Sequence, residues 1–263
     1  GAKWSPPATI MFVRDERFII ACPTDAGLYL VAMLAPLADL ASFTVDVEAS
    51  YDDYVARCSQ LSDILGGARR TARPRGISSF SGFFRDSAGP GWVLVGDAGH
   101  FKDPAPGQGI SDAFRQGEVL AAAIVEAGGV ATATDEAMTR WWRWRDRDAA
   151  GMHWFAHDFG AAGPVPIVFE GVVDGLAREP DGMRRAVDVL NHRVEPKELL
   201  TPRRAAAAAA RAIASRKHPA RVVLAEVREL AGREVRRRWR NHYPLYASGS
   251  PVPGVDPATT AGG

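Results

Sequence analysis

The sequence predicts a mixed α/β fold, with a small antiparallel sheet first, a strand–turn–helix unit next, and helices in the remainder. Three observations support this prediction. Short β-rich runs alternate with turn residues up to Leu34, an apolar run leads through Gly96-Asp97 into a helix, and helical spacing of apolar residues dominates after residue 130. We expect four segments, at residues 1–90, 91–128, 129–200 and 201–263.

Composition is typical of a soluble globular protein. The 263 residues carry a net charge of +1 and are 46% hydrophobic, which is enough for a sizeable core in one or two domains. No apolar run reaches membrane-spanning length and no signal peptide opens the chain, so a cytoplasmic protein is the simplest interpretation. Cys22 and Cys58 lie in apolar surroundings, which favours buried free thiols over a disulfide.

The first segment is expected to form an antiparallel sheet followed by a helix. Strands are predicted at Thr9–Val13, Arg17–Ala21 and Leu28–Leu34, the first two being joined by a turn at residues 14–16. A helix is predicted from Asp52 to Leu65, where Gly66-Gly67 would end it. Aromatic side chains at Phe80, Phe83 and Phe84 then either line a pocket or belong to the core, and the core is the commoner case.

The second segment holds the most informative motif. Trp92 to Val95 is expected to be a strand covered on both faces, and Gly96 lets the chain turn so that Asp97 can reach a ligand beyond the strand end. Two prolines, Pro104 and Pro106, stiffen the following loop. Gly107 and Gly109 remove side chains at the start of a helix whose residues Ala113, Gly117, Leu120, Ala121 and Ile124 form a small-residue face for close packing.

This motif resembles the second flavin-binding motif of FAD-dependent monooxygenases of the p-hydroxybenzoate hydroxylase fold, a family that includes geranylgeranyl-reductase-like enzymes. The matching elements are Gly96-Asp97-Ala98-Gly99-His100, Pro104 and Gly107-Gln108-Gly109. The resemblance implies an antiparallel substrate-domain sheet joined to the C-terminal part of an FAD-binding Rossmann-like domain. A strand-to-helix turn in which Asp97 is merely a cap would not require the Pro-x-x-Gly-x-Gly pattern.

The resemblance also implies roles for the matching residues. Asp97, after the turn at Gly96, would accept hydrogen bonds from the ribitol chain of FAD, and Pro104 would shape the loop beside the flavin ring. Backbone N–H groups of Gly107, Gln108, Gly109 and Ile110 would face the N1–C2=O edge, where negative charge collects on reduction. His100 is more readily a packing residue than an acid or base, and no catalytic residue is assigned.

The implied activity is that of an FAD-dependent oxidoreductase, in which NADPH or NADH reduces the flavin and a small organic substrate is hydroxylated. A flavin-dependent double-bond reductase is the related alternative. A Gly-x-Gly-x-x-Gly motif for the pyrophosphate does not occur in this chain, because Ile110, Ser111 and Asp112 follow Gly107-Gln108-Gly109. The chain is therefore also interpreted as a non-catalytic remnant or as half of a split flavoprotein. Such a half would need a homo-oligomer or a missing N-terminal partner segment.

The third segment is expected to be helical. A helix capped by Thr134 would carry Trp141, Trp142 and Trp144 on the core side and arginines 140, 143, 145 and 147 outside. The Trp-x-Trp pair resembles a motif of flavin-dependent halogenases, but the Ile-Pro that completes that motif is missing. His153 and His157 lie four apart without a third ligand, so no metal site is predicted. Residues Phe155, Phe159, Pro164, Pro166 and Phe169 suggest an irregular apolar segment.

The last segment is basic. Between Pro202 and Asn241 there are twelve Arg or Lys residues against three Glu, a local charge of +9. Helices are predicted on either side of Pro219, the second with Val223, Val227, Leu230 and Ala231 along one stripe. Docking of this stripe on the body or on a second subunit is favoured over nucleic-acid binding, since no nucleic-acid motif accompanies the charge. Residues 248–263 are expected to be disordered.

Overall fold

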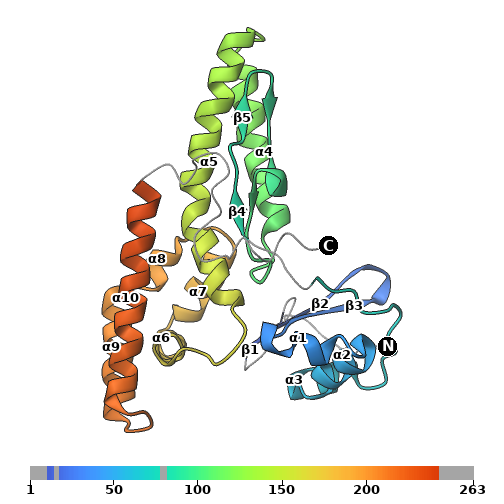
Figure 1. The fold of residues 1–263 in the computed structure, drawn as a ribbon, viewed down its shortest axis with the longest axis vertical. Coiled ribbons are helices and arrows are strands. Elements are labelled where there is room, and N and C mark those ends of the chain that lie inside the picture. Colours follow the sequence, from blue (N-terminus) through green and yellow to red (C-terminus); the bar gives the residue numbers. More distant parts are fainter. Residues whose placement is uncertain (1–10, 15–17, 78–81, 243–263) are drawn as a thin grey trace. The chain divides into compact units, whose positions relative to one another are not determined.

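The computed structural model describes residues 11–14, 18–77 and 82–242 (Figure 1). The chain divides into two compact units, the first within residues 1–80 and 160–165 and the second within 81–159 and 166–263. Most of the turn predicted at residues 14–16, Phe80 of the aromatic cluster, and residues 248–263 lie outside the described residues. The fold class is mixed, with many helices and small antiparallel sheets, as the sequence predicts.

The first unit contains the predicted antiparallel sheet. Strands β1 (Met11–Arg14), β2 (Phe18–Pro23) and β3 (Tyr29–Leu34) pair in sequence order, with the 3₁₀ helix η1 (Asp25–Gly27) between the last two. Opposite partners include Ile19 with Met33 and Ala21 with Val31. The prediction of three strands here is confirmed to within two residues at the ends that the structure describes.

Short helices follow this sheet: η2 (Leu37–Asp39), α1 (Leu40–Phe43), α2 (Val47–Ala56) and α3 (Ser59–Leu65). The single helix predicted from Asp52 to Leu65 is wrong, because Cys58 is extended and interrupts it. The first part begins earlier, where Asp46 Oδ1 accepts from Ala49 N (3.0 Å). Buried Ile19, Ala21, Cys58 and Leu61 form the core of this unit.

The second unit opens with two short antiparallel strand pairs. β4 (Phe83–Phe84) pairs with β7 (His100–Phe101), and β5 (Ala88–Gly89) pairs with β6 (Trp92–Val93). The strand predicted from Trp92 to Val95 as covered on both faces is therefore wrong in length and burial, since Trp92 is 45% exposed. Gly91 adopts φ +76° in the turn of a hairpin, so the strand at Trp92 pairs with the residues just before it, Ala88 and Gly89.

Two long helices run side by side in the second unit, α4 (Gly109–Glu126) and α5 (Ala131–Gly160) (Figure 1). Trp141 joins them, because its Nε1 donates to the Gln116 carbonyl oxygen (2.9 Å). Thr134 is not an N-cap as predicted, since α5 begins three residues earlier. The buried side of α4 is also unlike the prediction: Asp112, Gln116 and Leu120 are buried, whereas Ala121 is exposed.

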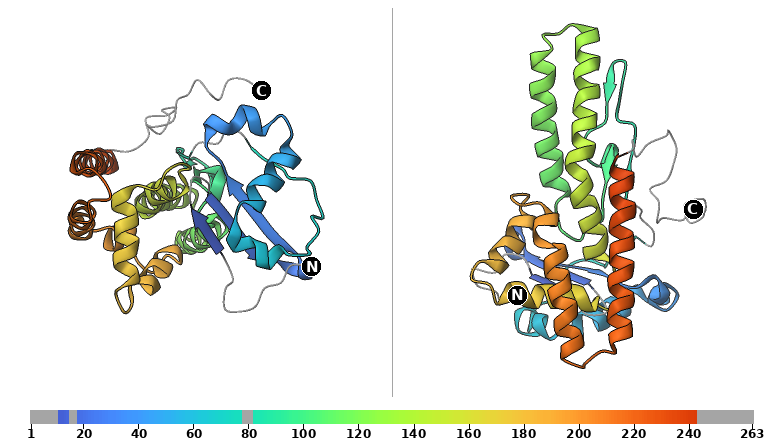
Figure 2. Two further views of the ribbon diagram at one scale, coloured as in Figure 1. Left: turned by 90° about the horizontal axis from the view of Figure 1, so that it is seen from below. Right: turned by 90° about the vertical axis from the view of Figure 1, so that its left-hand side faces the viewer.

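The remaining helices form a packed cluster of α6 (Ile167–Ala177), α7 (Gly182–Leu190), α8 (Pro196–Leu199), α9 (Pro202–Ala214) and α10 (Ala220–His242). Figure 2 shows α9 and α10 as a neighbouring pair, divided at Pro219 as the sequence predicts. Phe155 and Phe159 belong to α5, where their rings stack, so the irregular segment predicted there is much shorter. The core side of α10 contains Val223, Val227 and Leu230, while Ala231 is exposed.

Side chains of α10 explain part of its charge. Arg237 forms two hydrogen bonds to the Asp158 carboxylate (2.6 and 2.8 Å), and its guanidinium lies 4.9 Å from the ring centroid of Trp154. Glu226 accepts from the backbone N–H groups of Ile167 and Val168 (3.0 and 2.7 Å) and so caps α6 from another helix. These contacts support docking of α10 on its own unit.

Both cysteines are free, Cys58 buried and Cys22 partly exposed. Within the described ranges, no helix is long and apolar enough to cross a membrane.

Loss of the Glu226 cap should destabilise the second unit. Glu226→Ala leaves two first-turn N–H groups of α6 without their acceptor, at a cost of about 1–2 kcal/mol. Urea unfolding followed by tryptophan fluorescence measures this change. The matched control is Glu229→Ala, whose carboxyl side chain is 69% exposed on the same helix and should cost less than about 0.5 kcal/mol. Equal losses for the two variants would contradict the assignment of the cap.

Candidate functional site

The candidate site is the Gly-Asp loop, residues 96–110, which leads from β6 into α4. Its first turn is the 3₁₀ helix η3 (Gly96–Ala98). Gly96 has φ +58°, and a Cβ at this position would lie 3.2 Å from Ala113 Cβ. Only glycine meets both conditions without strain, so α4 packs directly against the turn.

Asp97 is the middle residue of this turn and is exposed. Its carboxylate makes no hydrogen bond to any residue within the described part of the chain. A Cβ added to Gly109 would lie 3.8 Å from Asp97 Oδ1, so the carboxylate and the start of α4 border the same exposed patch. The structure thus brings together two residues that the motif placed twelve positions apart.

The middle of the loop is ordered by its own backbone. Gly107 N donates to the Pro104 carbonyl oxygen (2.8 Å), and Gly107 has φ +70°, a conformation that favours glycine. Ala105 N donates to Asp103 Oδ1 (2.9 Å), while the Ala105 side chain is fully buried. Pro104 is exposed at the surface of this turn. The shape of the loop is therefore supported by hydrogen bonds and burial within the chain itself.

Gln108 is the N-cap residue of α4, but it does not cap the helix with its side chain. That side chain is buried, and its Nε2 donates to the Leu190 carbonyl oxygen (2.8 Å). Only its backbone is available to a ligand. Gly109 and Ile110, which follow, are exposed, so the positive end of the helix opens toward solvent.

A cluster of three polar side chains, which the sequence analysis did not identify, lies beside the first turn of α4 and is largely buried. Lys102 Nζ contacts Asp112 Oδ2, and His192 Nε2 lies 3.0 Å from Asp112 Oδ1. Burial acts to raise the pKa of Asp112, but the contacts with His192 and Lys102 outweigh it and hold that pKa below its ordinary value. Burial lowers the pKa of Lys102 despite the neighbouring carboxylate. The geometry is that of an ion pair shielded from water.

Arg145 corrects the prediction that the arginines of α5 face outward. Arg140, Arg143 and Arg147 are exposed, but Arg145 is completely buried beneath Gly99. Its Nη2 donates to Ser87 Oγ (2.8 Å) and its Nε to Asp146 Oδ1 (2.7 Å). Burial raises the pKa of Asp146 to about 6, against the opposing effect of Arg145.

Gly99 of the motif is explained by this packing. A Cβ there would lie 2.5 Å from Ser87 Oγ and 2.7 Å from Arg145 Nη1. Any larger residue would displace the buried guanidinium, so this glycine serves packing and not a ligand.

His100 is also a packing residue in the structure. It is buried in β7, with its ring 4.3 Å from that of Phe84, which lies 4.7 Å from the ring of His153. Burial lowers the pKa of His153 to about 3 and that of His100 well below 6.5. His157 is exposed, unlike His153. Among the described residues, no three His, Cys, Asp or Glu side chains are placed to hold a metal ion.

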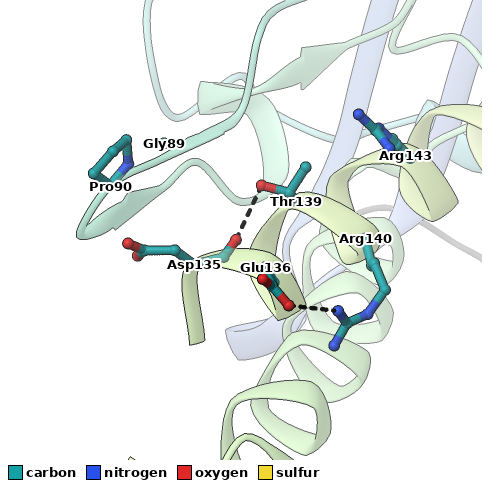
Figure 3. Close-up of a pocket in the computed structure, with 7 residues that line it drawn as sticks. All are labelled: Gly89, Pro90, Asp135, Glu136, Thr139, Arg140 and Arg143. Carbon is teal, nitrogen blue, oxygen red and sulfur yellow. Dashed lines mark hydrogen bonds and ion pairs between the residues drawn. The ribbon is translucent and has the colours of Figure 1, made fainter. Parts of the chain in front are cut away.

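A surface groove of about 380 Å³ lies elsewhere, between the β5–β6 turn and the start of α5 (Figure 3). Asp135 holds the two elements together by accepting from Gly91 N (2.9 Å), and Glu136 pairs with Arg140 at 3.7 Å. The groove contains no residue of the Gly-Asp loop. It is lined by Gly89, Pro90, Asp135, Glu136, Thr139, Arg140 and Arg143.

No protein-family model matches this sequence, and no curated protein matches it. Among solved structures, the chain is similar to the crystal structure of CmlS, a flavin-dependent halogenase. The sequence identity is 23% and the TM-score is 0.45, over 85% of this chain and 41% of that one. The chain thus spans less than half the length of that structure.

Acid should destabilise the second unit through its two buried histidines. An unfolded histidine titrates near pH 6.5, whereas His153 accepts a proton only near pH 3 when folded. The unfolded state therefore binds more protons below pH 6.5. Stability is complete above that pH and falls, as pH decreases, by about 1.4 kcal/mol per unit for each neutral histidine. Asp146 opposes this trend between about pH 6 and 4, and Asp103, whose pKa burial also raises, opposes it too, whereas the lowered pKa of Asp112 acts in the same direction as the histidines. The histidine contribution is therefore measured by its loss in a variant.

Urea unfolding at pH 7.5, 6.0 and 5.0 measures the trend. His153→Leu should remove about one proton from the pH dependence, and Thr139→Ala, which replaces a side chain of the same helix that does not titrate, should leave it unchanged. An identical pH dependence in all three proteins would refute this account of the buried histidines.

Proposed function

We propose that this chain belongs to an FAD-dependent oxidoreductase and that its Gly-Asp loop binds the flavin. The observation that supports the proposal is that the exposed Asp97 carboxylate lies beside Gly109, at the start of α4, where no side chain caps the helix. The acceptor oxygens of Asp97 and the backbone donors of the helix start border one patch, and Gly109 adds no side chain between them. A polar chain with hydroxyl groups attached to a flat, electron-accepting ring fits this combination.

Each part of the patch has a role toward FAD. Asp97 would accept hydrogen bonds from ribitol hydroxyls, and the N–H groups of Gly109 and Ile110 would donate to the pyrimidine edge of the ring. The positive helix end favours negative charge there, which stabilises the reduced state. FAD, when bound, supplies the redox chemistry, and the loop supplies binding and electrostatics.

The reaction we propose is hydroxylation of a small organic substrate with NADPH or NADH as electron donor. Double-bond reduction by the same reduced flavin is the second candidate. Incorporation of labelled oxygen from O₂ into the product distinguishes the two, since only hydroxylation transfers it.

The exposed face of α4 supports the additional proposal that the chain provides one wall of a flavin site. Ile110, Phe114 and Val125 are 75, 77 and 79% exposed, and Gly117 and Ala121 lie between them along one stripe. Large apolar side chains in such a row are unusual on a solvent-facing helix. A nucleotide-binding segment that covers this stripe would supply the phosphate contacts whose Gly-rich motif the sequence lacks.

The loop geometry is tested by adding a side chain at Gly109, in the glycine cradle that this residue forms beside Asp97. Gly109→Ala places a methyl group in ordinary contact distance of Asp97, so the fold should tolerate it while FAD loses room. We expect FAD affinity, measured by quenching of flavin fluorescence, to fall at least tenfold, or about 1.4 kcal/mol. Gly76→Ala is the matched control, because this glycine lies outside both the loop and the α4 stripe and its Cβ would meet nothing within 4 Å. Equal affinity for the two variants would exclude this cradle as the binding site.

The stripe is tested separately. Phe114→Glu should decrease FAD retention without lowering the melting temperature, because the side chain it replaces is exposed. Leu224→Glu, on the exposed face of α10, is the control and should retain FAD normally. Sedimentation velocity with and without FAD shows whether a second copy covers the stripe. Normal retention by a monomeric Phe114→Glu protein would contradict the one-wall proposal.

A further inference from the structure

We propose that Lys102, Asp112 and His192 are positioning residues, which hold the first turn of α4 and balance its charge behind the Gly-Asp loop. The inference rests on the proposed function insofar as it concerns flavin. It extends that function because none of the three is a matching residue of the motif, although Lys102 lies within the Gly-Asp loop.

The placement of the ion pair is the first argument. Lys102 follows β7 and Asp112 lies in the first turn of α4, and both are buried, at 6 and 8% exposure. Asp112 is thus one helical turn behind the exposed N–H groups of Gly109 and Ile110. A single carboxylate at this point would cancel part of the positive potential of the helix end, and Lys102 neutralises it.

The backbone of His192 is the second, independent argument. His192 has φ +56°, a region in which glycine is normally found, at the end of α7. The pattern of a helix stop is present, with His192 N donating to the Val189 carbonyl oxygen (3.1 Å) and Arg193 N to that of Asp188 (2.8 Å). A strained histidine persists here, and its ring reaches Asp112 (3.0 Å). Strain at such a position points to a use for the side chain.

A second link joins the same two segments. Gln108, four residues before Asp112, donates to the Leu190 carbonyl oxygen (2.8 Å), two residues before His192. The last residue of α7 and the turn after it therefore contact the start of α4 through the side chains of Gln108 and His192. This arrangement holds the helix end in place from the interior and leaves its outer surface free for a ligand.

Neutralising one charge at a time provides the test. Asp112→Asn leaves the Lys102 cation unpaired and should favour reduced, negatively charged flavin, which raises the midpoint potential of bound FAD. Lys102→Met leaves the carboxylate unpaired and should lower that potential. The double variant should return close to the wild-type value. We expect each single shift to correspond to about a tenfold change in the relative affinity for reduced and oxidised FAD.

A readout without flavin tests the positioning role directly. Hydrogen exchange of amides 112–116, the first of α4 with helical acceptors (Asp112 N donates to the Gln108 carbonyl oxygen, 2.9 Å), should be faster in the flavin-free chain of His192→Gly, although glycine relieves the backbone strain. A histidine that only ends α7 predicts unchanged or slower exchange, which would overturn the positioning role. The control is the pair Glu179→Gln and Arg204→Met, which removes an ion pair (2.7 Å) between the end of α6 and α9. It should change neither readout.

The outcomes separate the two proposals. Potential shifts of equal sign in the two single variants, or none, with FAD bound, would overturn the charge balance and leave the proposed function intact. A wild-type chain that retains no FAD would contradict the proposed function and the charge balance with it, and hydrogen exchange would then decide the positioning role by itself.

Discussion

The direct contact between the Gly96 turn and α4 is the constraint on which the candidate site depends. Because Gly96 has a positive φ and no side chain, Ala113 packs against the turn, and this contact fixes where α4 begins relative to Asp97. Asp97 is left exposed beside Gly109 as a consequence. The site is therefore built from packing of glycine and alanine, and within the described residues the Asp97 carboxylate accepts no hydrogen bond.

Buried charged side chains pack against the loop and the start of α4 on the interior side of this contact. Arg145, which is fully buried, packs against Gly99, and Lys102 and Asp112, which are 6 and 8% exposed, lie beside the start of α4. Burying paired charges yields little net stability, so their value lies in specifying a single arrangement, which we infer from their position. These side chains disfavour other conformations of the loop, since a conformation that displaced one charge would leave its partner buried and unpaired.

Local chemistry made much of this predictable. The strands before residue 35, the start of α4, the break at Pro219 and the turn at Gly96 follow from turn residues and periodicity that act within a few positions. Contacts distant in sequence were not accessible. The strand at Trp92 pairs with residues just before it, which an apolar run does not reveal. Arg145 resembled its exposed neighbours, although its spacing of four from Trp141 placed it on the buried face. Asp112 looked like an ordinary acid in the first turn of a helix, and only His192, eighty residues later, shows its role.

The central claim is that the Gly-Asp loop holds FAD, and the visible absorption spectrum of the purified chain tests it most directly. The protein would be incubated with FAD, passed through gel filtration and compared with Asp97→Ala treated in the same way. Flavin bands that coelute with the wild type, and are lost in the variant while its melting temperature is unchanged, are the predicted result. Flavin retained equally by both proteins, or by neither, would contradict the claim that Asp97 and the start of α4 form the binding site.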